Sequence, residues 1–246
     1  MDNSAIQTSF VNGAAAKEKD RVLAALDNGT NSIHMVVVRL HPEIPAFTII
    51  AKEKDTVRLG ARDPKTGDLT AVAMKRAISA LQRCQKLAKS FNVEQIVAVA
   101  TSAVREAPNG RDFLQQVEAE LGLFVNIISG QEEARRIYLG VLSGLELKNI
   151  PHIIIDIGGG STELILGDSH EPRYLSSTKV GAVRLTATYI TTDPINQVEL
   201  QSLQAYSRGM LERPVEGYLA QLKPREQPRL VGTSEPIETL PSVHAT

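Results

Sequence analysis

Residues 152–168 combine residue types that could bind and cleave a phosphate group. An apolar run ends at Asp156, three glycines follow at 158–160, and a second apolar run carries Glu163. Two short β-branched runs joined by so few residues predict a β-hairpin. The glycines leave the backbone N–H groups of the turn uncovered, so that its tip can wrap an anion. Because Asp156 adds a hard oxygen ligand beside the tip, the pattern predicts a phosphate cradle with a neighbouring magnesium ion.

The same pattern occurs near the N-terminus. Residues 27–37 align without a gap with residues 156–166, an offset of 156 − 27 = 129 positions, and Asp, Gly and Ser coincide. A repeat of this length suggests two lobes. If the lobes face each other, Asp27 and Asp156 line opposite walls of one cleft. One such turn is weak evidence and is more typical of an ordinary hairpin, whereas two turns that match in register favour the cradle.

Three motifs in order resemble those of a known family. DNGTNSIHM at 27–35, ISGQEEARRIYLGV at 128–141 and DIGGGSTELI at 156–165 are similar to motifs of the exopolyphosphatase/guanosine pentaphosphate phosphohydrolase (Ppx/GppA) family. The resemblance covers most of the chain, from about Val22 to about Thr233. It implies an α/β fold with two ribonuclease-H-like lobes and a cleft between them, as in the superfamily of actin, sugar kinases and chaperone ATPases.

The resemblance divides the chain into three parts. We expect a disordered tail over 1–20, a first lobe over 21–136 and a second lobe over 137–246. The second lobe is expected to be truncated, because relatives continue with the rest of that lobe and further segments.

The last motif departs from the family pattern. The third glycine turn of the family, G-[AT]-S-G-T, is replaced by GTSEP at 232–236. Glu235 brings a negative charge to a place that should approach phosphate, and Pro236 removes a backbone donor. An inactive fragment that binds polyphosphate or nucleotide therefore stays an alternative to an active enzyme.

The length, charge and cysteine content of the chain limit which kinds of protein it can be. With 246 residues, of which 42% are hydrophobic, the chain can form one large or two modest domains. A formal net charge of −1 gives no general attraction to nucleic acid or to a membrane surface. The single cysteine, Cys84, excludes an internal disulfide and falls at a helical core position. Without a signal peptide or a long apolar stretch, we expect a cytoplasmic protein, and a homodimer is compatible with these features.

Hydrophobic periodicity predicts the elements that carry the motifs. We expect strands over 22–27, 33–40, 46–51, 95–100, 123–128, 173–179 and 228–231, and helices over 71–91, 109–121, 129–145, 184–190 and 196–222, the last one broken by Pro224. The basic face of the helix over 71–91 is interpreted as solvated surface, with a polyanion-binding stripe as the alternative. The loop over 52–70 is expected to hang over the cleft.

Two adjacent glutamates begin the helix after Ser129. Ser129 and Glu132, three residues apart, predict a capping box that gives Glu132 a structural role. Glu133 has no such role and is free to point into the cleft. The resemblance agrees, because it implies that the second glutamate of E-E-A-R is the catalytic base. In the alternative, Glu133 complements the helix dipole or pairs with Arg136.

Arg105 follows the strand over 95–100, at the edge where open α/β sheets bind ligands. The resemblance implies that it faces substrate phosphate, and a surface pair with Glu106 is the alternative. Glu163 lies in an apolar strand, where a carboxylate needs a partner. We assign it to the metal, with a structural salt bridge as the alternative.

The predicted site has three groups of residues. Glu133 and Asp156 are catalytic, and Asp156 and Glu163 hold Mg²⁺. The substrate is held by Asp27, Asn28, Gly29, Asn31, Ser32, Arg105, Gly158, Gly159, Gly160 and Ser161.

These residues predict a phosphoanhydride hydrolase. Such a reaction needs a held phosphoryl group, neutralised charge and a base that orients water. We expect hydrolysis of terminal phosphate from inorganic polyphosphate, with guanosine pentaphosphate as a further substrate. An ATP-dependent sugar or acetate-type kinase is the alternative enzyme, because the same paired turns hold nucleotide phosphates throughout the superfamily.

Overall fold

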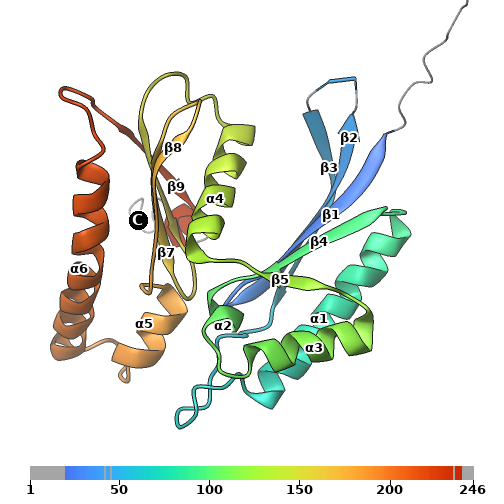
Figure 1. Ribbon diagram of the computed structural model, residues 1–246. Helices are drawn as coiled ribbons and strands as arrows, with labels where there is room; N and C mark the ends of the chain where they lie inside the picture. The colour runs from blue at the N-terminus through green and yellow to red at the C-terminus, as the bar shows by residue number, and fades with distance from the viewer. Residues whose placement is uncertain (1–19, 42, 45, 235, 240–246) are drawn as a thin grey trace, which may run out of the picture.

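The computed structural model describes residues 20–41, 43–44, 46–234 and 236–239 and shows two lobes side by side, each built on one mixed β-sheet (Figure 1). This arrangement confirms the predicted α/β class with two lobes. The predicted tail over 1–20 lies, apart from Asp20, outside the described residues, and so does Glu235.

The first lobe contains a five-stranded sheet in the order β3-β2-β1-β4-β5. Its elements are β1 (Arg21–Asn28), β2 (Ser32–His41), β3 (Ala46–Thr56), α1 (Ala71–Ser90), β4 (Gln95–Ala100), α2 (Ser102–Arg105), α3 (Gly110–Leu121) and β5 (Val125–Ile127). β1 pairs antiparallel with β2 and parallel with β4. The carboxyl-terminal ends of β1 and β4 therefore lie at the same edge of the sheet.

The core of the first lobe lies between this sheet and helices α1 and α3, which share one hydrophobic cluster. On α1 the buried side chains are mainly alanines with Leu81 and Cys84, so that the helix can approach the strands closely. Cys84 is fully buried, which confirms its role as a small apolar core residue. Met74 and Ile78, on the same helix, are only partly buried against this core.

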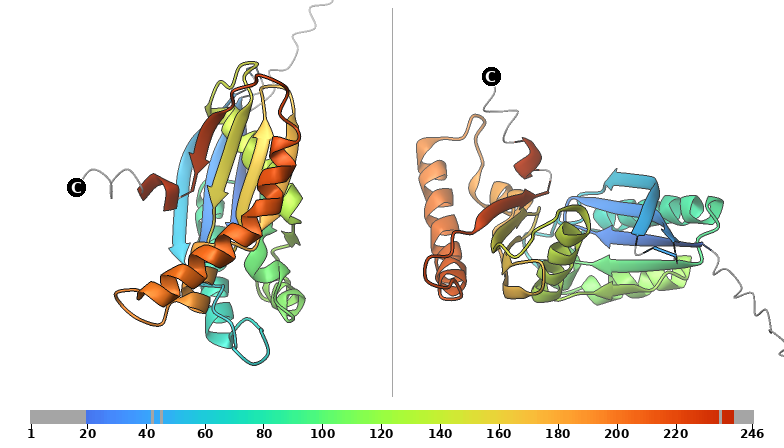
Figure 2. Two further views of the ribbon diagram at one scale, coloured as in Figure 1. Left: turned by 90° about the vertical axis from the view of Figure 1, so that its left-hand side faces the viewer. Right: turned by 90° about the horizontal axis from the view of Figure 1, so that it is seen from above.

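The second lobe contains a four-stranded sheet in the order β8-β7-β6-β9. Its elements are α4 (Gly130–Gly144), β6 (His152–Ile157), β7 (Thr162–Gly167), β8 (Pro172–Thr178), α5 (Ala182–Tyr189), α6 (Gln197–Leu219) and β9 (Arg229–Thr233). Helices α4 and α6 cover opposite faces of this sheet (Figures 1 and 2). The predicted boundary between residues 136 and 137 falls inside α4, and the domain division stays a prediction.

Several predicted boundaries differ from the structure. β3 continues to Thr56 because it pairs with β2 along its whole length, through an irregularity at Val37/Val38, so the expected loop over 52–70 is shorter. α6 ends at Leu219, before Pro224, and tolerates Pro214 in its interior. The short helix α2 was not predicted. Among the described residues, no helix has the length and apolar character needed to cross a membrane.

Tyr138 anchors α4 to the second sheet. Its ring is 1% exposed and packs with Ala134, Ile154 and Ile165. Its hydroxyl donates a 2.6 Å hydrogen bond to the backbone oxygen of Asp168. This hydrogen bond satisfies the Tyr138 hydroxyl, which is buried among apolar side chains. Removing the hydroxyl leaves the Asp168 carbonyl without this donor.

We therefore expect Tyr138→Phe to lower the free energy of unfolding by about 1–2 kcal/mol, the cost of an unmade buried hydrogen bond. Chemical denaturation monitored by circular dichroism measures the change. The half-buried Tyr218 of α6 provides the control variant Tyr218→Phe. Equal stability of the two variants would contradict the anchoring role.

Candidate active site

The two glycine turns form hairpins of the same geometry. Strand β1 pairs with β2 so that Asp27 lies opposite His34, and β6 pairs with β7 so that Asp156 lies opposite Glu163. Each hairpin therefore presents its aspartate at the second-to-last residue of its first strand, two positions before the first glycine of the turn. The two segments that align in the sequence therefore have the same antiparallel strand pairing in the structure.

The turns are closed by equivalent hydrogen bonds. The N–H of Gly29 donates to the oxygen of Ser32 at 3.1 Å, and the N–H of Gly158 donates to the oxygen of Ser161 at 2.9 Å. Each closing bond uses the N–H of the first glycine of its turn and the carbonyl of the serine that ends the turn.

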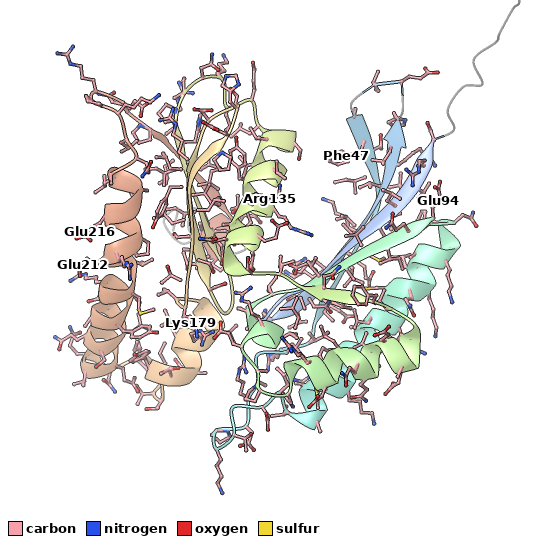
Figure 3. The ribbon with its side chains drawn as sticks, viewed as in Figure 1. Phe47, Glu94, Arg135, Lys179, Glu212 and Glu216 are labelled. Carbon is pink, nitrogen blue, oxygen red and sulfur yellow. The ribbon has the colours of Figure 1, made fainter. Side chains whose placement is uncertain are left out.

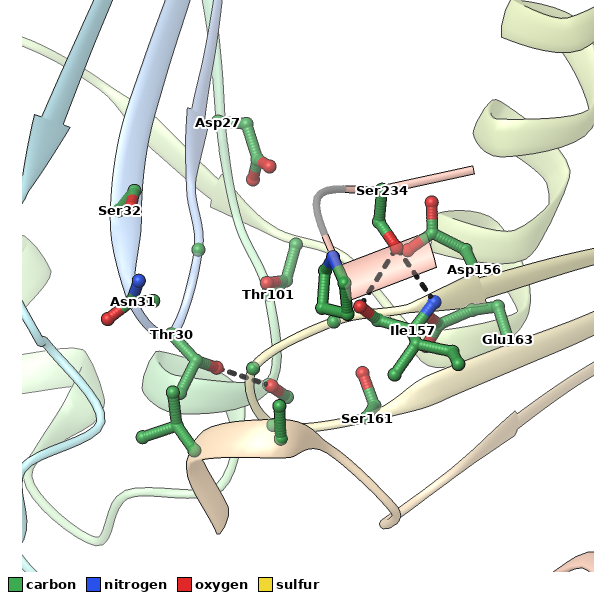
Figure 4. A pocket seen from close by; sticks show the side chains of 18 of the residues that line it. Asp27, Thr30, Asn31, Ser32, Thr101, Asp156, Ile157, Ser161, Glu163 and Ser234 are labelled. Carbon is green, nitrogen blue, oxygen red and sulfur yellow. Dashed lines mark hydrogen bonds between the residues drawn. The ribbon is translucent and has the colours of Figure 1, made fainter. Parts of the chain in front are cut away.

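Both tips line one pocket between the lobes, with a volume of about 340 Å³ (Figure 4). Asp27 and Asp156 lie on facing walls, as the two-lobe prediction requires. The predicted residues that line the pocket are Asp27, Gly29, Asn31, Ser32, Glu133, Asp156, Gly158, Gly159, Gly160, Ser161 and Glu163. The structure thus brings together most of the residues selected from sequence.

Asn28 and Arg105 are the two predicted site residues that do not line the pocket. Asn28 is fully buried behind the turn, where its Nδ2 donates to the oxygen of Val99 at 2.8 Å. Arg105 donates through Nη1 to Glu133 Oε2 at 3.0 Å and to the oxygen of Ile128 at 2.9 Å. Both residues therefore lie behind the pocket wall, where their hydrogen bonds hold neighbouring segments in place.

The pocket also contains residues that sequence reasoning missed. They are Thr30, His34, Thr101, Ser102, Ile157, Ala182, Val183, Ser234 and Pro236. Thr101 and Ser102 directly follow β4, so their position at the end of a parallel strand was the available signal. Thr30 Oγ1 and Ser102 Oγ lie 2.9 Å apart, which ties the first turn to α2.

The second turn is oriented by α5. The oxygen of Gly158 accepts from the N–H of Ala182 at 3.0 Å, and the oxygen of Gly159 accepts from the N–H of Arg184 at 3.0 Å. The oxygen of Gly160 accepts from Arg184 Nε at 2.7 Å. In a planar trans peptide the C=O and the following N–H point in opposite directions. The N–H groups that follow these three carbonyls therefore point away from α5.

Those N–H groups belong to Gly159, Gly160 and Ser161, all of which line the pocket. Within the described part of the chain, no acceptor is assigned to any of them. Three adjacent uncommitted N–H groups form the kind of concave nest that binds anions.

The first turn is oriented in the same way by the loop after β3. The oxygen of Thr30 accepts from the N–H of Gly60 at 2.8 Å, and the oxygen of Asn31 accepts from the N–H of Val57 at 3.0 Å. The N–H of Asn31 consequently points away from this loop. Ser32 lines the pocket with a buried hydroxyl that has no hydrogen-bond partner among the described residues.

The glycines are required where the two turns meet. A Cβ on Gly160 would lie 2.6 Å from Thr30 Oγ1 and would also collide with Ser102 Oγ. A Cβ on Gly159 would lie 3.2 Å from Thr30 Cβ. The second tip therefore packs directly on the first, with no room for a side chain between the lobes.

Buried carboxylates give the pocket its electrostatic character. Burial raises the pKa of Asp27 to about 7, and the charges of Glu133 and Asp156 add to the rise. Burial, followed by the charge of Glu133, raises the pKa of Glu163 to about 8. Burial also raises the pKa of Asp156. Since no lysine or arginine is among the described residues that line the pocket, these carboxylates lack a cation there.

Glu133 faces the pocket from the first turn of α4. Burial raises the pKa of its carboxyl, and the hydrogen bond and charge of Arg105 act in the opposite direction. The expectation that Glu133 has no structural partner is therefore wrong. The sequence left two other ion pairs open, Glu133 with Arg136 and Arg105 with Glu106. Neither is found among the described ion pairs, because Arg105 binds Glu133 and Arg136 binds Glu132.

The predicted capping box is only half formed. Ser129 Oγ accepts from the N–H of Glu132 at 3.1 Å. The Glu132 carboxylate instead binds Arg135 at 2.7 Å and Arg136 at 2.8 Å, because both arginines lie on its own helix face. Glu132 nevertheless lies outside the pocket lining, as its structural assignment requires.

The end of β9 contacts the wall of the pocket that carries Asp156. Thr233 Oγ1 donates to Asp156 Oδ2 at 2.6 Å. Ser234 Oγ donates to the oxygen of Ile157 at 2.9 Å and accepts from its N–H at 3.1 Å. The altered third turn thus still contacts the second cradle. Pro236 lines the pocket.

The donor set fits a magnesium ion. Asp156 and Glu163 lie opposite each other on β6 and β7 and line the pocket without a cation. Glu163 accepts from Ser177 Oγ at 2.7 Å, and the predicted alternative of a salt bridge to Glu163 is not found among the described ion pairs. The described residues contain no ready cluster of three His, Cys, Asp or Glu ligands. Mg²⁺ commonly uses one or two carboxylates together with water and substrate phosphate, so two are sufficient.

Comparison with known proteins identifies the family. A model described as the Ppx/GppA phosphatase family matches residues 36–246. The chain belongs to this family. The match includes α4 and the second glycine turn, and the equivalent hairpin geometry relates the first turn to them.

Curated relatives of this family member have two kinds of name. A guanosine-5'-triphosphate,3'-diphosphate pyrophosphatase of Aeromonas hydrophila subsp. hydrophila is 34% identical over 198 residues, which cover 80% of this chain and 39% of the relative. A putative exopolyphosphatase of Haemophilus influenzae is 30% identical over 226 residues, covering 92% of this chain and 68% of the relative. The chain thus spans well under half the length of the first relative.

Solved structures support the same assignment. An exopolyphosphatase from Cytophaga hutchinsonii superposes with a TM-score of 0.82 at 27% identity, covering 91% of this chain and 70% of that chain. The Aquifex aeolicus PPX-GPPA enzyme gives a TM-score of 0.72 at 30% identity, covering 92% of this chain and 72% of that chain. A PilM-PilN type IV pilus biogenesis complex shares the fold alone, with a TM-score of 0.55 at 14% identity and coverage of 90% of this chain and 84% of that chain.

Arg184 joins the second cradle to the first lobe. Besides Gly160, it reaches both carboxylate oxygens of Glu106, at 3.0 and 2.9 Å. Lys179, which lies at the junction of the lobes (Figure 3), adds a contact of 3.4 Å to the same carboxylate. One guanidinium therefore fixes both the orientation of the turn and the distance between the lobes.

We expect Arg184→Gln to loosen the turn over 158–161, because a charge-assisted hydrogen bond to the Gly160 oxygen is lost. The hydrogen-bonded amide hydrogens of Gly158, which closes the turn, and of Ala182, which binds the Gly158 oxygen, should exchange with solvent about tenfold faster, as loss of about 1.5 kcal/mol of local stability implies. Hydrogen–deuterium exchange with mass spectrometry resolves the segment. The exposed Arg208 of α6 gives the control variant Arg208→Gln. Unchanged exchange in Arg184→Gln would rule out the positioning role.

The raised pKa values also predict how stability depends on pH. For Asp27, whose folded pKa of about 7 exceeds the ordinary value of 3.8, folding favours the protonated form. Its contribution to stability is complete below the unfolded pKa and is lost as the pH rises through the folded pKa. Without divalent metal, the melting temperature should therefore fall between about pH 4 and about pH 8.

Asp27→Asn should flatten this profile, because the amide does not ionise. Thermal melting in chelator across this pH range measures the effect. The control is Glu118→Gln, which changes an exposed residue of α3. A profile of Asp27→Asn as steep as that of the control would show that Asp27 does not titrate in this range.

Proposed function

We propose that the chain hydrolyses the terminal phosphoanhydride bond of inorganic polyphosphate with the help of Mg²⁺. The observation that supports this proposal most strongly is the pocket itself, in which two equivalent turns direct backbone N–H groups at a space lined by buried carboxylates. Family membership and relatives named as exopolyphosphatases support this substrate class.

The turns hold the terminal phosphoryl group. The N–H groups of Gly159, Gly160 and Ser161 donate to its oxygens from one lobe, and the N–H of Asn31 and the hydroxyl of Ser32 donate from the other. Because these donors are fixed by bonds behind them, they need no reorganisation as charge develops in the transition state. In-line attack then depends on where the water is held.

Asp156 and Glu163 are the residues that would hold Mg²⁺. The bound ion supplies positive charge that neutralises phosphate oxygens, which four nearby carboxylates would otherwise repel. Thr233 fixes the Asp156 carboxylate, and Ser177 fixes that of Glu163. Asp27, on the facing wall, completes the acidic surroundings.

Glu133 is the proposed general base. It accepts a proton from the attacking water, and the departing phosphate chain leaves with its bridging oxygen. Burial raises the pKa of the Glu133 carboxyl toward the working pH, where a base is more effective. Arg105 keeps the carboxylate at the pocket wall through the 3.0 Å ion pair. Arg105 thus acts as a positioning residue, and its predicted contact with phosphate stays a prediction.

Guanosine pentaphosphate is a second candidate substrate. The Aeromonas hydrophila relative, at 34% identity, is named for a guanosine triphosphate diphosphate. Its terminal phosphate presents the same anhydride to the same cradle. The kinase alternative receives no comparable support, because the matching family is one of phosphatases.

Replacing Glu133 tests the mechanism. Glu133→Gln should lower the rate of phosphate release from polyphosphate by about 10²–10⁴-fold, the usual contribution of a general base. A colorimetric phosphate assay with Mg²⁺ measures it. The adjacent Glu132→Gln, outside the pocket, is the matched control and should retain activity.

An unchanged rate in Glu133→Gln eliminates the base assignment. Binding of polyphosphate without release by the unaltered chain would instead identify a binding protein, the alternative that the altered third turn raised.

A further inference from the structure

The first glycine hairpin presents three different side-chain donors to the active-site pocket. Asp27 lies opposite His34 in the pairing of β1 with β2, and Ser32 precedes His34 by two positions on β2. Opposed residues of an antiparallel pair leave the same face of a sheet, and so do residues two apart on one strand. All three residues line the pocket. We call them the first-lobe donor set.

The second hairpin has a carboxylate where the first has an imidazole. Asp156 lies opposite Glu163 in the same way that Asp27 lies opposite His34. Asp156 and Glu163 offer oxygen ligands alone, which suits Mg²⁺. Asp27 and His34 offer one carboxylate and one imidazole nitrogen. The two walls of the pocket therefore present equivalent positions with different ligand chemistry.

Ser32 gives independent evidence that the first wall binds a ligand. Its side chain is 5% exposed, and its Oγ has no hydrogen-bond partner among the described residues. A buried hydroxyl of this kind costs free energy unless a ligand satisfies it. The hydroxyl oxygen has two lone pairs besides its proton, so it can coordinate a cation while it donates to a phosphate oxygen.

The charges around the first-lobe donor set also favour a cation. Within the described lining, the pocket contains four carboxylates and no lysine or arginine. Burial, together with the charges of Glu133 and Asp156, raises the pKa of Asp27 to about 7. Lys54, which lies opposite His34 on β3, is not among the described lining residues. A divalent ion at Asp27 would offset this crowding of negative charge.

We propose that Asp27, Ser32 and His34 form a second divalent-metal site, on the first-lobe wall, which takes a transition metal ion such as Zn²⁺ in preference to Mg²⁺. Imidazole nitrogen is a good ligand for Zn²⁺ and its neighbours in the first transition row, whereas Mg²⁺ is bound through oxygen. Water and a phosphate oxygen would complete the coordination. A phosphoryl group between the walls would then meet a cation on each side, as in two-metal phosphatases.

This inference goes beyond the proposed function, because metal binding at the first wall needs no turnover. Its first test therefore uses the unaltered chain without substrate. Co²⁺ replaces Zn²⁺ in many sites and is paramagnetic, so it shifts the proton resonances of a coordinated imidazole far outside the ordinary spectrum. Mg²⁺ in excess is added to occupy the oxygen-only pair of the second wall.

We expect shifted imidazole resonances from the Co²⁺-loaded chain, and we expect them to persist in excess Mg²⁺. A spectrum without shifted imidazole resonances overturns the inference. Loss of these resonances when Mg²⁺ is added contradicts the proposed preference and overturns it as well.

His34→Gln identifies the ligand. The shifted resonances should disappear, and calorimetry in excess Mg²⁺ should show Zn²⁺ bound about 10–100-fold more weakly, the loss already caused by removing a hydrogen-bond partner of a metal ligand. His34 is exposed, and circular dichroism checks that the variant is folded. The exposed His170 provides the matched control His170→Gln, which lies outside the pocket and should keep both signals. Shifted resonances that persist in His34→Gln assign the ion to another histidine and refute the site.

Asp27→Asn tests the second ligand in the same way. It should also weaken Zn²⁺ binding about 10–100-fold, because the neutral amide is a poorer ligand than a carboxylate. Zn²⁺ affinity equal to that of the unaltered chain in folded Asp27→Asn excludes the proposed ligand set.

Phosphate release with Mg²⁺, measured in parallel, separates this inference from the proposed function. Hydrolysis by a chain that shows no shifted imidazole resonances overturns the second metal site alone. Zn²⁺ binding that depends on His34, in a chain that releases no phosphate with either metal, overturns the proposed function alone.

Discussion

The structure of this site depends on the fixed orientation of a few peptide groups. The carbonyls of the second turn are held by the first residues of α5, and those of the first turn by the loop after β3. Since C=O and N–H are opposed across a planar peptide, bonds made behind the turns aim the donors into the pocket. The contacts that shape the cradle are therefore not contacts with the ligand. Substitutions behind the turns can disturb binding as much as substitutions within them.

The carboxylates impose a complementary constraint. Asp27, Glu133, Asp156 and Glu163 meet in a buried space where burial disfavours ionisation of all four, and the charges of Glu133 and Asp156 add to the effect on Asp27 and Glu163. Such an arrangement costs stability in the metal-free protein and becomes favourable only when positive charge arrives. In the proposed function, a divalent cation bound together with phosphate would supply this positive charge.

The lobes meet through the turns themselves. Glycine at 160 allows the second tip to pack against Thr30 and Ser102, and Arg184 links the same glycine to Glu106. Closure of the lobes and the shape of the cradle are consequently coupled. The same junction separates a pocket lined by carboxylates from one lined by arginines.

The sequence by itself determined the two hairpins, most helices and strands, the family and most of the pocket lining, because these depend on local periodicity, turn chemistry and motif spacing. Only the tertiary structure decided that Arg105 binds Glu133, that Glu132 binds Arg135 and Arg136 instead of closing a capping box, and that Asn28 lies behind the wall. It also decided that α5 orients the glycine carbonyls. Such contacts join segments far apart in the chain or depend on side-chain rotamers, and neither leaves a period or a spacing that a sequence can display.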